Sequence, residues 1–427
     1  MGTANLKRSA TVLFLTVCLS MAVFASGSGE AQADEQEVVT IRFTSHLLDT
    51  GQAGNAYVDA IERFEDANPD IDIEIDFLPT SNFSTGIRTR VLGGEQLDVV
   101  DYYNVAILTD ISRLSDDVMS DLSGTSVANS YGSAFLAPVT FDGTVLAVPE
   151  TMNSNGLIFN ATLFEELGLE PASNWAEFLA LCADLQAEGY IPLAMAGERW
   201  VPQFIWAPMI TDNGGGAEYA AALEAGEVRV NDANSPYRTV VEKLLELESR
   251  GFFPEDWLGL KQDQSKDLLA FNRAGMLVTG TWDLASLAER NPENEYGVMV
   301  VPGNDSGMPT PIFNIGVWRT VAARSEHREQ ALRFVEFMNG PENLVPLSRQ
   351  SKSVPVMEGI DVDDEIVQTV EALVRSDRSD MFWPHYLEDN AVYQVFNTYT
   401  IRILSGDPLD ATLGEMQSEI DALIATD

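Results

Sequence analysis

A polar segment between two apolar runs is the feature that most constrains how this chain can fold. The apolar run 145–148 suits a short buried strand, and Pro149 ends its regular pairing. Residues 150–155 then offer mostly polar side chains, and the apolar pattern resumes at 157–159. We interpret residues 150–155 as a place where the chain passes between two lobes beside a cleft.

Turn and capping residues surround this segment. A tight-turn dipeptide at 142–143 opens the run. Asn160 can cap a short helix that Gly168 ends. Asn174 and Glu177 form a capping-box-like pair that predicts the start of a second helix.

An ordered set of residues runs through this segment: Gly143, Ala147-Val148-Pro149, Leu157, Phe159-Asn160, Phe164 and Trp175. In this order the set resembles the pattern of the extracellular solute-binding proteins of ABC importers, in the group that binds carbohydrates (family 1, maltose-binding-protein-like). Further matches are residues 64–75, Phe271 to Met276 with Gly280-Thr281-Trp282, and Ile315 to Trp318 followed by 331–337. The resemblance covers most of the chain and is weakest toward the C-terminus.

Strand and helix patterns alternate in the first part of the chain. Residues 36–44, 71–77 and 97–100 are predicted strands, and 56–67 and 83–92 are predicted helices. This rhythm is typical of an α/β domain with a largely parallel sheet. The 427 residues are enough for two substantial lobes. The resemblance implies a two-lobed, periplasmic-binding-protein-like fold, in which each lobe is a mainly parallel sheet flanked by helices.

The polar crossings divide the chain into discontinuous lobes. We expect three inter-lobe crossings, near 150–154, 312–316 and 338–342. The expected parts are a leader (1–33), an N-terminal lobe (34–151 plus 313–340) and a C-terminal lobe (152–312 plus 341–427).

The N-terminus has the pattern of a secretory signal peptide. A basic pair precedes an apolar stretch from 10 to 24 and then small residues, with cleavage expected after Ala25 or Ala33. Cys18 follows a leucine by three residues, as in lipoprotein signals, but Val17 is larger than the residue those signals favour. We interpret Cys18 as a plain leader residue, with a lipid anchor as the alternative. The protein is predicted to be exported to the periplasm or the cell exterior.

An excess of acidic residues restricts the partners. The chain has 66 Asp and Glu against 25 Lys and Arg, a formal net charge of −41. Binding to nucleic acid or to anionic lipid depends on clustered basic residues, so neither partner is expected. Scattered acids that keep an exported protein soluble explain the charge. Adaptation to a saline habitat is the alternative, and a gain of stability in molar NaCl would support it.

Catalytic and metal-binding motifs are not found in the sequence. None of the three histidines has a His or Cys at metal-ligand spacing, and the glycines at 214–216 lack the Lys-Ser/Thr of a phosphate loop. The acids at 361–365 lack the glycine and distal Glu of a calcium loop. Cys182 lies in an apolar helical pattern and is expected in the core. We expect no enzyme activity and no cofactor, with two convergent carboxylates of a glycosidase left open as the alternative.

Aromatic and polar residues at predicted strand ends and crossings are the candidate solute contacts. A sugar offers apolar C–H faces and a rim of hydroxyls, which suit aromatic platforms flanked by polar side chains. Core packing is the alternative for each aromatic candidate, and we assign Trp175, Trp206 and Trp257 to packing. The resemblance further implies that Trp282 stacks on a sugar. The candidate contacts are Ser45, His46, Tyr102, Tyr103, Asn104, Asn153, Trp200, Trp282, Asp283, Asn314, Trp318 and Trp383.

We predict an exported protein that captures a sugar or small oligosaccharide by hinge closure and delivers it to an ABC permease. Its partners would be the solute and permease subunits in the membrane, and it would act as a monomer. A polyol, a glycerol-phosphate-like or another non-sugar solute is one alternative. A secreted carbohydrate-active enzyme and a sensory solute-binding protein are two others.

Overall fold

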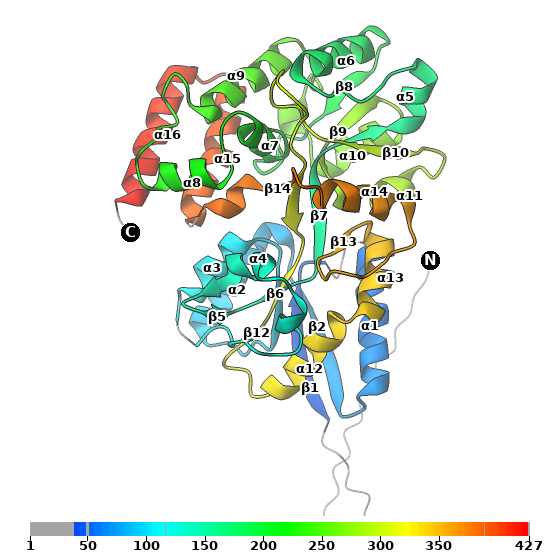
Figure 1. The fold of residues 1–427 in the computed structure, drawn as a ribbon, viewed down its shortest axis with the longest axis vertical. Helices are drawn as coiled ribbons and strands as arrows, with labels where there is room; N and C mark the ends of the chain where they lie inside the picture. Colours follow the sequence, from blue (N-terminus) through cyan, green and yellow to red (C-terminus); the bar gives the residue numbers. More distant parts are fainter. Residues whose placement is uncertain (1–37, 48–50, 116, 388, 426–427) are drawn as a thin grey trace, which may run out of the picture. The chain divides into compact units, whose positions relative to one another are not determined.

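Two large β-sheets, each with its own helices, organise the described part of the chain (Figure 1). The structure is a computed structural model that describes residues 38–47, 51–115, 117–387 and 389–425, without the side chains of residues 51–53 and 81. The predicted signal peptide, both cleavage positions and Cys18 lie outside the described residues. The α/β class predicted from the sequence is confirmed.

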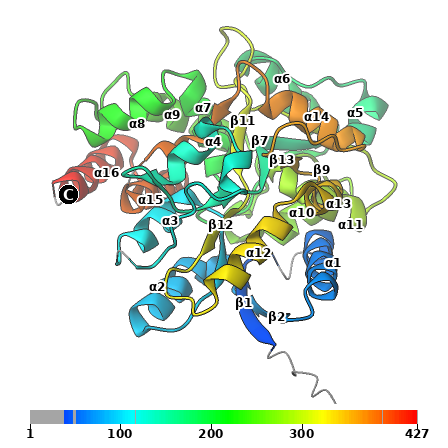
Figure 2. The same cartoon turned by 60° about the horizontal axis from the view of Figure 1, so that its bottom comes forward.

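The first sheet has five strands, β1 (Val39–Ser45), β2 (Ile71–Phe77), β3 (Val99–Tyr102), β6 (Val148–Pro149) and β12 (Trp318–Val321). They lie in the order β2-β1-β3-β12-β6. Its helices are α1 (Gly51–Ala67), α2 (Phe83–Gly93), α3 (Val105–Ser112), α12 (Arg328–Met338) and α13 (Pro341–Ser351). Helices α1, α12 and α13 pack together on one side of the sheet, and α2 packs with α3 on the other (Figure 1 and Figure 2). We call this sheet and these helices the first lobe.

The second sheet has seven strands, β7 (Thr151–Asn160), β8 (Ile191–Ala194), β9 (Ala274–Gly280), β10 (Tyr296–Met299), β11 (Ile312–Ile315), β13 (Val354–Pro355) and β14 (Asp380–Met381). We call it, with its helices, the second lobe. These helices are α5 (Ala161–Leu167), α6 (Trp175–Ala187), α7 (Gln203–Asp212), α8 (Ala217–Glu224), α9 (Pro236–Ser249), α10 (Gln262–Ala270), α11 (Leu284–Arg290), α14 (Glu365–Val374), α15 (Asn390–Leu404) and α16 (Leu409–Ile424). In the described ranges, no helix combines the length and apolar character that a membrane crossing requires.

Both sheets are mixed, whereas mainly parallel sheets were predicted. In the first sheet, β1 is parallel to β2 and β3, but β12 runs antiparallel to β3 and β6. In the second, β7 is antiparallel to β9, β10, β11 and β13. The antiparallel pairs arise because β7 and β12 are the strands that carry the chain from one sheet into the other.

The predicted polar crossing at 150–155 is mostly strand, not loop. Its residues from Thr151 onward form the first half of β7, whose edges pair with β11 and β13. The expected strand at 145–148 is divided between two short strands, β5 (Thr144–Val145) and β6. The polar side chains misled the prediction, because a strand with a polar face can still satisfy its backbone in a sheet.

The capping residues act as the sequence predicted. The side chain of Asn160 accepts a hydrogen bond from the backbone N–H of Leu163 (2.9 Å) at the start of α5, and Gly168 ends that helix with φ of 65°. Asn174 accepts from the N–H of Glu177 (2.9 Å) at the start of α6. These caps fix both ends of α5 and the start of α6.

Three passages connect the two sheets. The first is at 150–151 between β6 and β7, and the second at 316–317 between β11 and β12. The predicted third crossing, near 338–342, is instead the turn between α12 and α13, and α13 packs against α1 of the first lobe. The chain reaches the second sheet at 352–353, just before β13 pairs with β7.

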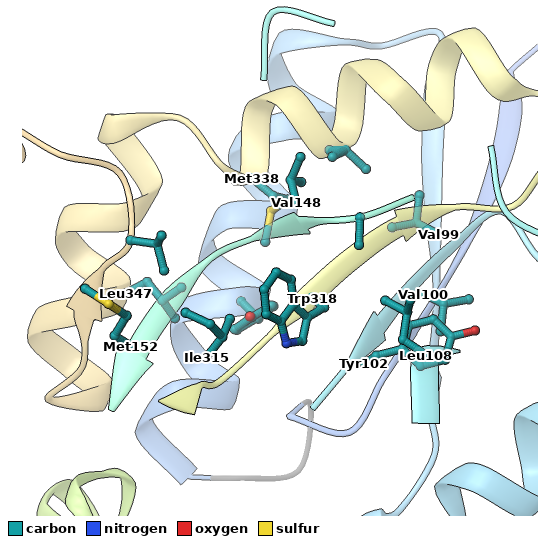
Figure 3. Packing of buried hydrophobic residues seen from close by; sticks show 14 of the residues in the cluster. Val99, Val100, Tyr102, Leu108, Val148, Met152, Ile315, Trp318, Met338 and Leu347 are labelled. Carbon is teal, nitrogen blue, oxygen red and sulfur yellow. The ribbon is translucent and has the colours of Figure 1, made fainter. Parts of the chain in front are cut away.

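Buried hydrophobic side chains surround the passages. Figure 3 shows Trp318 beside Ile315 and Val148, so residues that flank the first and second passages share one packed cluster. All three side chains are almost fully buried. The passages are therefore anchored in a hydrophobic core that continues from the first lobe into the second.

Candidate functional site

Polar side chains line one face of the crossing strands. Asn153 on β7 and Asn314 on β11 lie directly opposite each other. Because side chains alternate along a strand, Asn155 shares their face. The hydroxyl of Thr281, which follows β9, donates to Oδ1 of Asn153 (3.4 Å). Three amides from two strands thus form a polar floor beside the second passage.

Several amide atoms of this floor are buried without a hydrogen-bond partner. In the described part of the chain, neither Oδ1 nor Nδ2 of Asn155 is hydrogen-bonded, and Oδ1 of Asn314 is not. Buried polar atoms are normally paired, so unused donors and acceptors of this kind fit a bound polar ligand or water. Gly316 allows the close packing, because a Cβ there would lie 2.8 Å from Nδ2 of Asn153.

Aromatic rings from three segments of the second lobe form a row. The ring of Phe204 on α7 lies 5.8 Å from that of Trp200, 4.9 Å from that of Trp282 and 6.0 Å from that of Phe382, measured between centroids. Trp200 is 39 % exposed and Trp282 half-buried, whereas Phe204 and Phe382 are buried. Two tryptophan faces supported by buried phenylalanines make a platform for a flat apolar surface.

A glycine sets the position of the central tryptophan. Gly280 ends β9, and a Cβ at this position would lie 2.0 Å from the Trp282 ring. Only glycine lets the ring fold back over the end of the strand. The motif that places Trp282 after Gly280 therefore has a steric cause.

Asp283, predicted as a solute contact, is already bound within the protein. Its carboxylate lies 2.9 Å from Nζ of Lys266 and accepts a hydrogen bond from the Thr279 hydroxyl (2.5 Å). It is 5 % exposed. We conclude that Asp283 holds the turn carrying Trp282.

His46 and Tyr103 pack together where β1 and β3 end in the first lobe. Their ring centroids lie 5.2 Å apart. Burial lowers the pKa of His46 to about 4, so the imidazole is neutral at pH 7. Burial, and then the neighbouring Tyr393, raise the pKa of Tyr103. The pair offers a neutral, partly apolar surface with hydrogen-bonding ends.

Ser45, Tyr102 and Asn104 lie at the same strand ends but face inward. The hydroxyl of Ser45 donates to Asp101 (3.3 Å), and the side chain of Asn104 caps α3 by accepting from the N–H of Ala106 (2.7 Å). Tyr102 is 1 % exposed. The three side chains support the strand ends and leave the adjoining surface to His46 and Tyr103.

Tyr393 on α15 connects the first-lobe edge with the aromatic row. Its hydroxyl donates to Oε1 of Gln203 on α7, next to Phe204. Helix α15 contacts α3 of the first lobe, so elements of both lobes meet beside Tyr393.

A polar hollow of about 470 Å³ adjoins these residues. Nη1 of Arg199, the neighbour of Trp200, donates to the Thr398 hydroxyl (3.2 Å) at its wall. Its other lining residues include Asp110, Asp389, Asn390 and Gln394. The lining of this hollow is rich in hydrogen-bonding groups, and the rings of the aromatic row are not part of it.

Two predicted contacts are enclosed by protein. Trp383 is fully buried, with ring centroids of Trp206 and Phe396 at 6.0 and 5.0 Å. Trp318 lies on the opposite side of the passages, where with Phe313 it lines a separate hollow of about 560 Å³. The structure does not bring these two rings to the amide floor.

Some residues at the site were not expected. Phe204, Phe382 and Tyr393 were not among the predicted contacts, and Tyr393 lies within a long aromatic-rich helix. Asn155 lies in the segment predicted as a crossing but was not singled out. Trp200 and Phe204 are about one helical turn apart in sequence, and this spacing could have indicated that their rings are in contact.

The described residues contain no group of three or more His, Cys, Asp or Glu that could hold a metal ion. Cys182 is buried, and burial raises the pKa of its thiol. A buried thiol with a raised pKa is a poor nucleophile. The site is made of amides, aromatic rings and hydroxyls.

Comparisons with known proteins agree with this composition. A family model for bacterial extracellular solute-binding proteins matches residues 49–344. The multiple sugar-binding protein of Streptococcus mutans is 24 % identical over 325 residues, covering 75 % of each chain. The melibiose/raffinose/stachyose-binding protein MelE of Bacillus subtilis is 21 % identical over 357 residues, covering 81 % of this chain and 80 % of that protein. The solved structure of the binding protein RafE with raffinose has a TM-score of 0.79 at 22 % identity, covering 91 % of this chain and all of that one.

Proposed function

Because the chain belongs to the family of bacterial extracellular solute-binding proteins, we propose that it captures a sugar or small oligosaccharide and delivers it to an ABC permease. The observation that carries the proposal is the amide floor beside a row of tryptophan faces. Amides suit the hydroxyl rim of a sugar, and the rings suit its C–H faces. The named sugar-binding relatives support the same substrate class.

The proposed contacts come from both lobes. The second lobe would supply Trp200 and Trp282 as platforms, and the crossing strands would supply Asn153 and Asn314. The first lobe would supply its strand-end surface. The proposed solute contacts include predicted residues and residues that were not predicted. They are Asn153, Asn155, Trp200, Phe204, Trp282, Asn314, His46, Tyr103 and Tyr393.

The remaining predicted residues would act indirectly. Ser45, Tyr102, Asn104 and Asp283 would hold strand ends and turns in place, and Trp318 and Trp383 would stabilise the cores. Ser45, Asn104 and Asp283 are assigned in this way because they already have polar partners within the protein. Tyr102, Trp318 and Trp383 are assigned in this way because they are at most 1 % exposed.

Two tryptophans at the site favour more than one sugar ring. Trp200 and Trp282 both contact Phe204, with ring centroids at 5.8 and 4.9 Å, so each could offer a face to a separate ring. Micromolar binding corresponds to about 8 kcal/mol, which stacked rings and buried hydrogen bonds can supply after ordering costs.

We propose that binding stabilises a conformer in which both lobes touch the solute. The lobes would be residues 38–150 plus 317–351 and residues 151–316 plus 354–425, with the passages as hinges. This differs from the sequence-based limits, because α13 packs with α1. We further propose that the protein acts as a monomer and that catalysis is not part of its function.

A thermal-shift screen across sugars and polyols tests the proposal. A raffinose-type oligosaccharide is expected to raise Tm, and Trp282→Ala to abolish the rise. Phe271→Ala is the matched control, since this exposed ring precedes β9 whereas Trp282 follows its other end. A rise of Tm with polyols alone would mean that the solute is a polyol and not a sugar. No rise of Tm with any carbohydrate would refute the proposed substrate class.

A further inference from the structure

A buried arginine in the first lobe holds two carboxylates and an amide. Nε and Nη2 of Arg319 donate to the two oxygens of Asp101 (2.8 and 3.0 Å), and Nη2 also donates to Oε2 of Glu150 (2.5 Å). Nη1 donates to Oδ1 of Asn339 (2.8 Å). The Tyr57 hydroxyl donates to the other oxygen of Glu150 (2.5 Å). We call these five residues the Arg319 network.

Members of this network lie at or beside the passages. Glu150 belongs to the first passage, and Arg319 follows the second. Asn339 ends α12 within the first lobe, and its Nδ2 donates to the carbonyl of Pro149 (3.0 Å), directly before the first passage. Asp101 lies directly before the Tyr102-Tyr103 pair at the end of β3. One ionic network therefore joins the passages to the strand end that carries the first-lobe surface of the site.

The backbone of all three passages meets at Glu150. Its N–H donates to the carbonyl of Val317 (3.1 Å) in the second passage, and its carbonyl accepts from the N–H of Val356 (3.0 Å) just beyond the third. The carbonyl of the next residue, Thr151, accepts from the N–H of Gly316 (2.8 Å). The side chain and the backbone of Glu150 thus connect the passages to Arg319.

Stability alone is a weak reason for such a network. Arg319, Asp101 and Glu150 are at most 1 % exposed, and taking charges out of water costs much of what their attraction returns. Apolar residues of similar size often stabilise as well or better, while hydrogen-bonded charges impose a single geometry. Geometry at the passages is what a hinged protein has to control.

We propose that Arg319 is a positioning residue that fixes the directions in which the three passages leave the first lobe. Through Glu150 and Asn339 it restricts the relative orientation of the two lobes before any solute binds. Through Asp101 it ties this restriction to the strand end that carries Tyr103. The inference concerns the solute-free protein and holds for any solute.

The test measures the distribution of inter-lobe distances without solute. Spin labels at Glu74→Cys on β2 and Glu188→Cys after α6, both exposed positions, report one distance by pulsed electron resonance. Cys182 stays unlabelled because it is buried, and Cys18→Ser is included. Arg319→Met is expected to widen the distribution at a temperature where the protein is fully folded. An unchanged distribution would overturn the proposal.

A matched control separates positioning from stability. Arg324→Met removes an exposed arginine that binds Asp117 with the same two-bond geometry, and it is expected to leave the distribution unchanged. The triple change Arg319→Met, Asp101→Leu and Glu150→Met is expected to recover Tm but to keep the wide distribution. Recovery of the narrow distribution by this apolar triad would show that packing alone sets the lobes, and the proposal would fail.

A milder pair of variants covers the case in which Arg319→Met does not fold. Arg319→Lys keeps the charge but loses the planar fork, and Asn339→Leu removes an uncharged member of the network. Each is expected to widen the distance distribution, Arg319→Lys more than Asn339→Leu. Wild-type distributions in both variants would refute the positioning role.

Discussion

Two arginines close together on the chain, Arg319 and Arg324, bind an aspartate in the same way in opposite surroundings. Arg319 reaches Asp101 through bonds of 2.8 and 3.0 Å, and Arg324 reaches Asp117 through two bonds of 2.7 Å. The first pair is fully buried, while the side chains of the second are 49 % and 56 % exposed. The two Arg–Asp pairs share their hydrogen-bond geometry but differ in burial, and Arg319 also donates to Glu150 and Asn339.

The pKa values of the two aspartates move in opposite directions. Hydrogen bonds from Arg324, and then from Ser115, lower the pKa of Asp117 to about 2. Burial raises the pKa of Asp101 to about 6, against the pull of Arg319. The same two-bond geometry thus lowers the pKa of the exposed aspartate, whereas in the interior burial outweighs the effect of the arginine.

The largest expected effect comes from breaking the buried pair. Arg319→Met leaves two buried carboxylates without their cation, which is expected to cost about 3–5 kcal/mol in the free energy of unfolding. Urea denaturation at pH 7 measures it. Arg324→Met is expected to leave the midpoint nearly unchanged, because solvent and salt already screen that pair. Equal losses in both variants would contradict the comparison.

Two histidines that differ in burial extend the comparison to pH. Burial lowers the pKa of His385 from 6.5 to about 4. Between pH 6.5 and pH 4 this imidazole takes up a proton in the unfolded chain but not in the folded protein. The free energy of unfolding therefore falls as pH falls from 6.5 toward 4. At pH 5 the loss is about 2 kcal/mol relative to pH 7.

The replacement His385→Phe is expected to make the decline in stability between pH 7 and pH 5 shallower by that amount. Denaturation midpoints at several pH values measure the slope. His327→Phe, at a half-buried position, serves as the reference variant. A wild-type slope in His385→Phe would show that this imidazole titrates normally.

A smaller effect is expected from two tyrosine hydroxyls that each donate to a glutamate. The Tyr57 hydroxyl donates to buried Glu150 (2.5 Å), and the Tyr399 hydroxyl donates to Glu419 on the surface of α16 (2.8 Å). Tyr57→Phe leaves a buried oxygen of Glu150 unpaired and is expected to cost about 1–2 kcal/mol. In Tyr399→Phe water replaces the lost donor, so a smaller change is expected. Urea denaturation measures the free energy of unfolding of both variants. A loss in Tyr399→Phe as large as that in Tyr57→Phe would contradict the prediction.

Much of the fold could be predicted because its signals are local. The caps at Asn160 and Asn174 and the alternating strand at 71–77 depend on residues a few positions apart. The third passage was predicted in the wrong place because residues 339–341 would end a helix equally well at an inter-lobe crossing and at a turn within one lobe. Only the packing of α13 on α1, far apart in sequence, shows that the chain remains in the first lobe.

The candidate site was predictable in part for a related reason. Exposed Trp200 and half-buried Trp282 follow strands, where a ligand site is expected in this class. Trp383 could not be told from them, since its burial depends on Trp206 and Phe396 from other helices. The Arg319 network was missed altogether, because its members come from five separate segments.

The smallest effect concerns salt, and it isolates the surface pair from the net charge of −41. Self-repulsion among so many acids weakens as salt is added, which is expected to stabilise every variant alike. A double-mutant cycle cancels that common term and leaves only the coupling between the two side chains. At 1 M salt the Debye length falls to about 3 Å, so the Arg324–Asp117 coupling should weaken, since both groups are in contact with the screening ions. The Arg319–Asp101 coupling should persist, because ions cannot enter the core. Loss of both couplings at high salt would mean that solvent reaches the buried network, and the contrast between the two pairs would not hold.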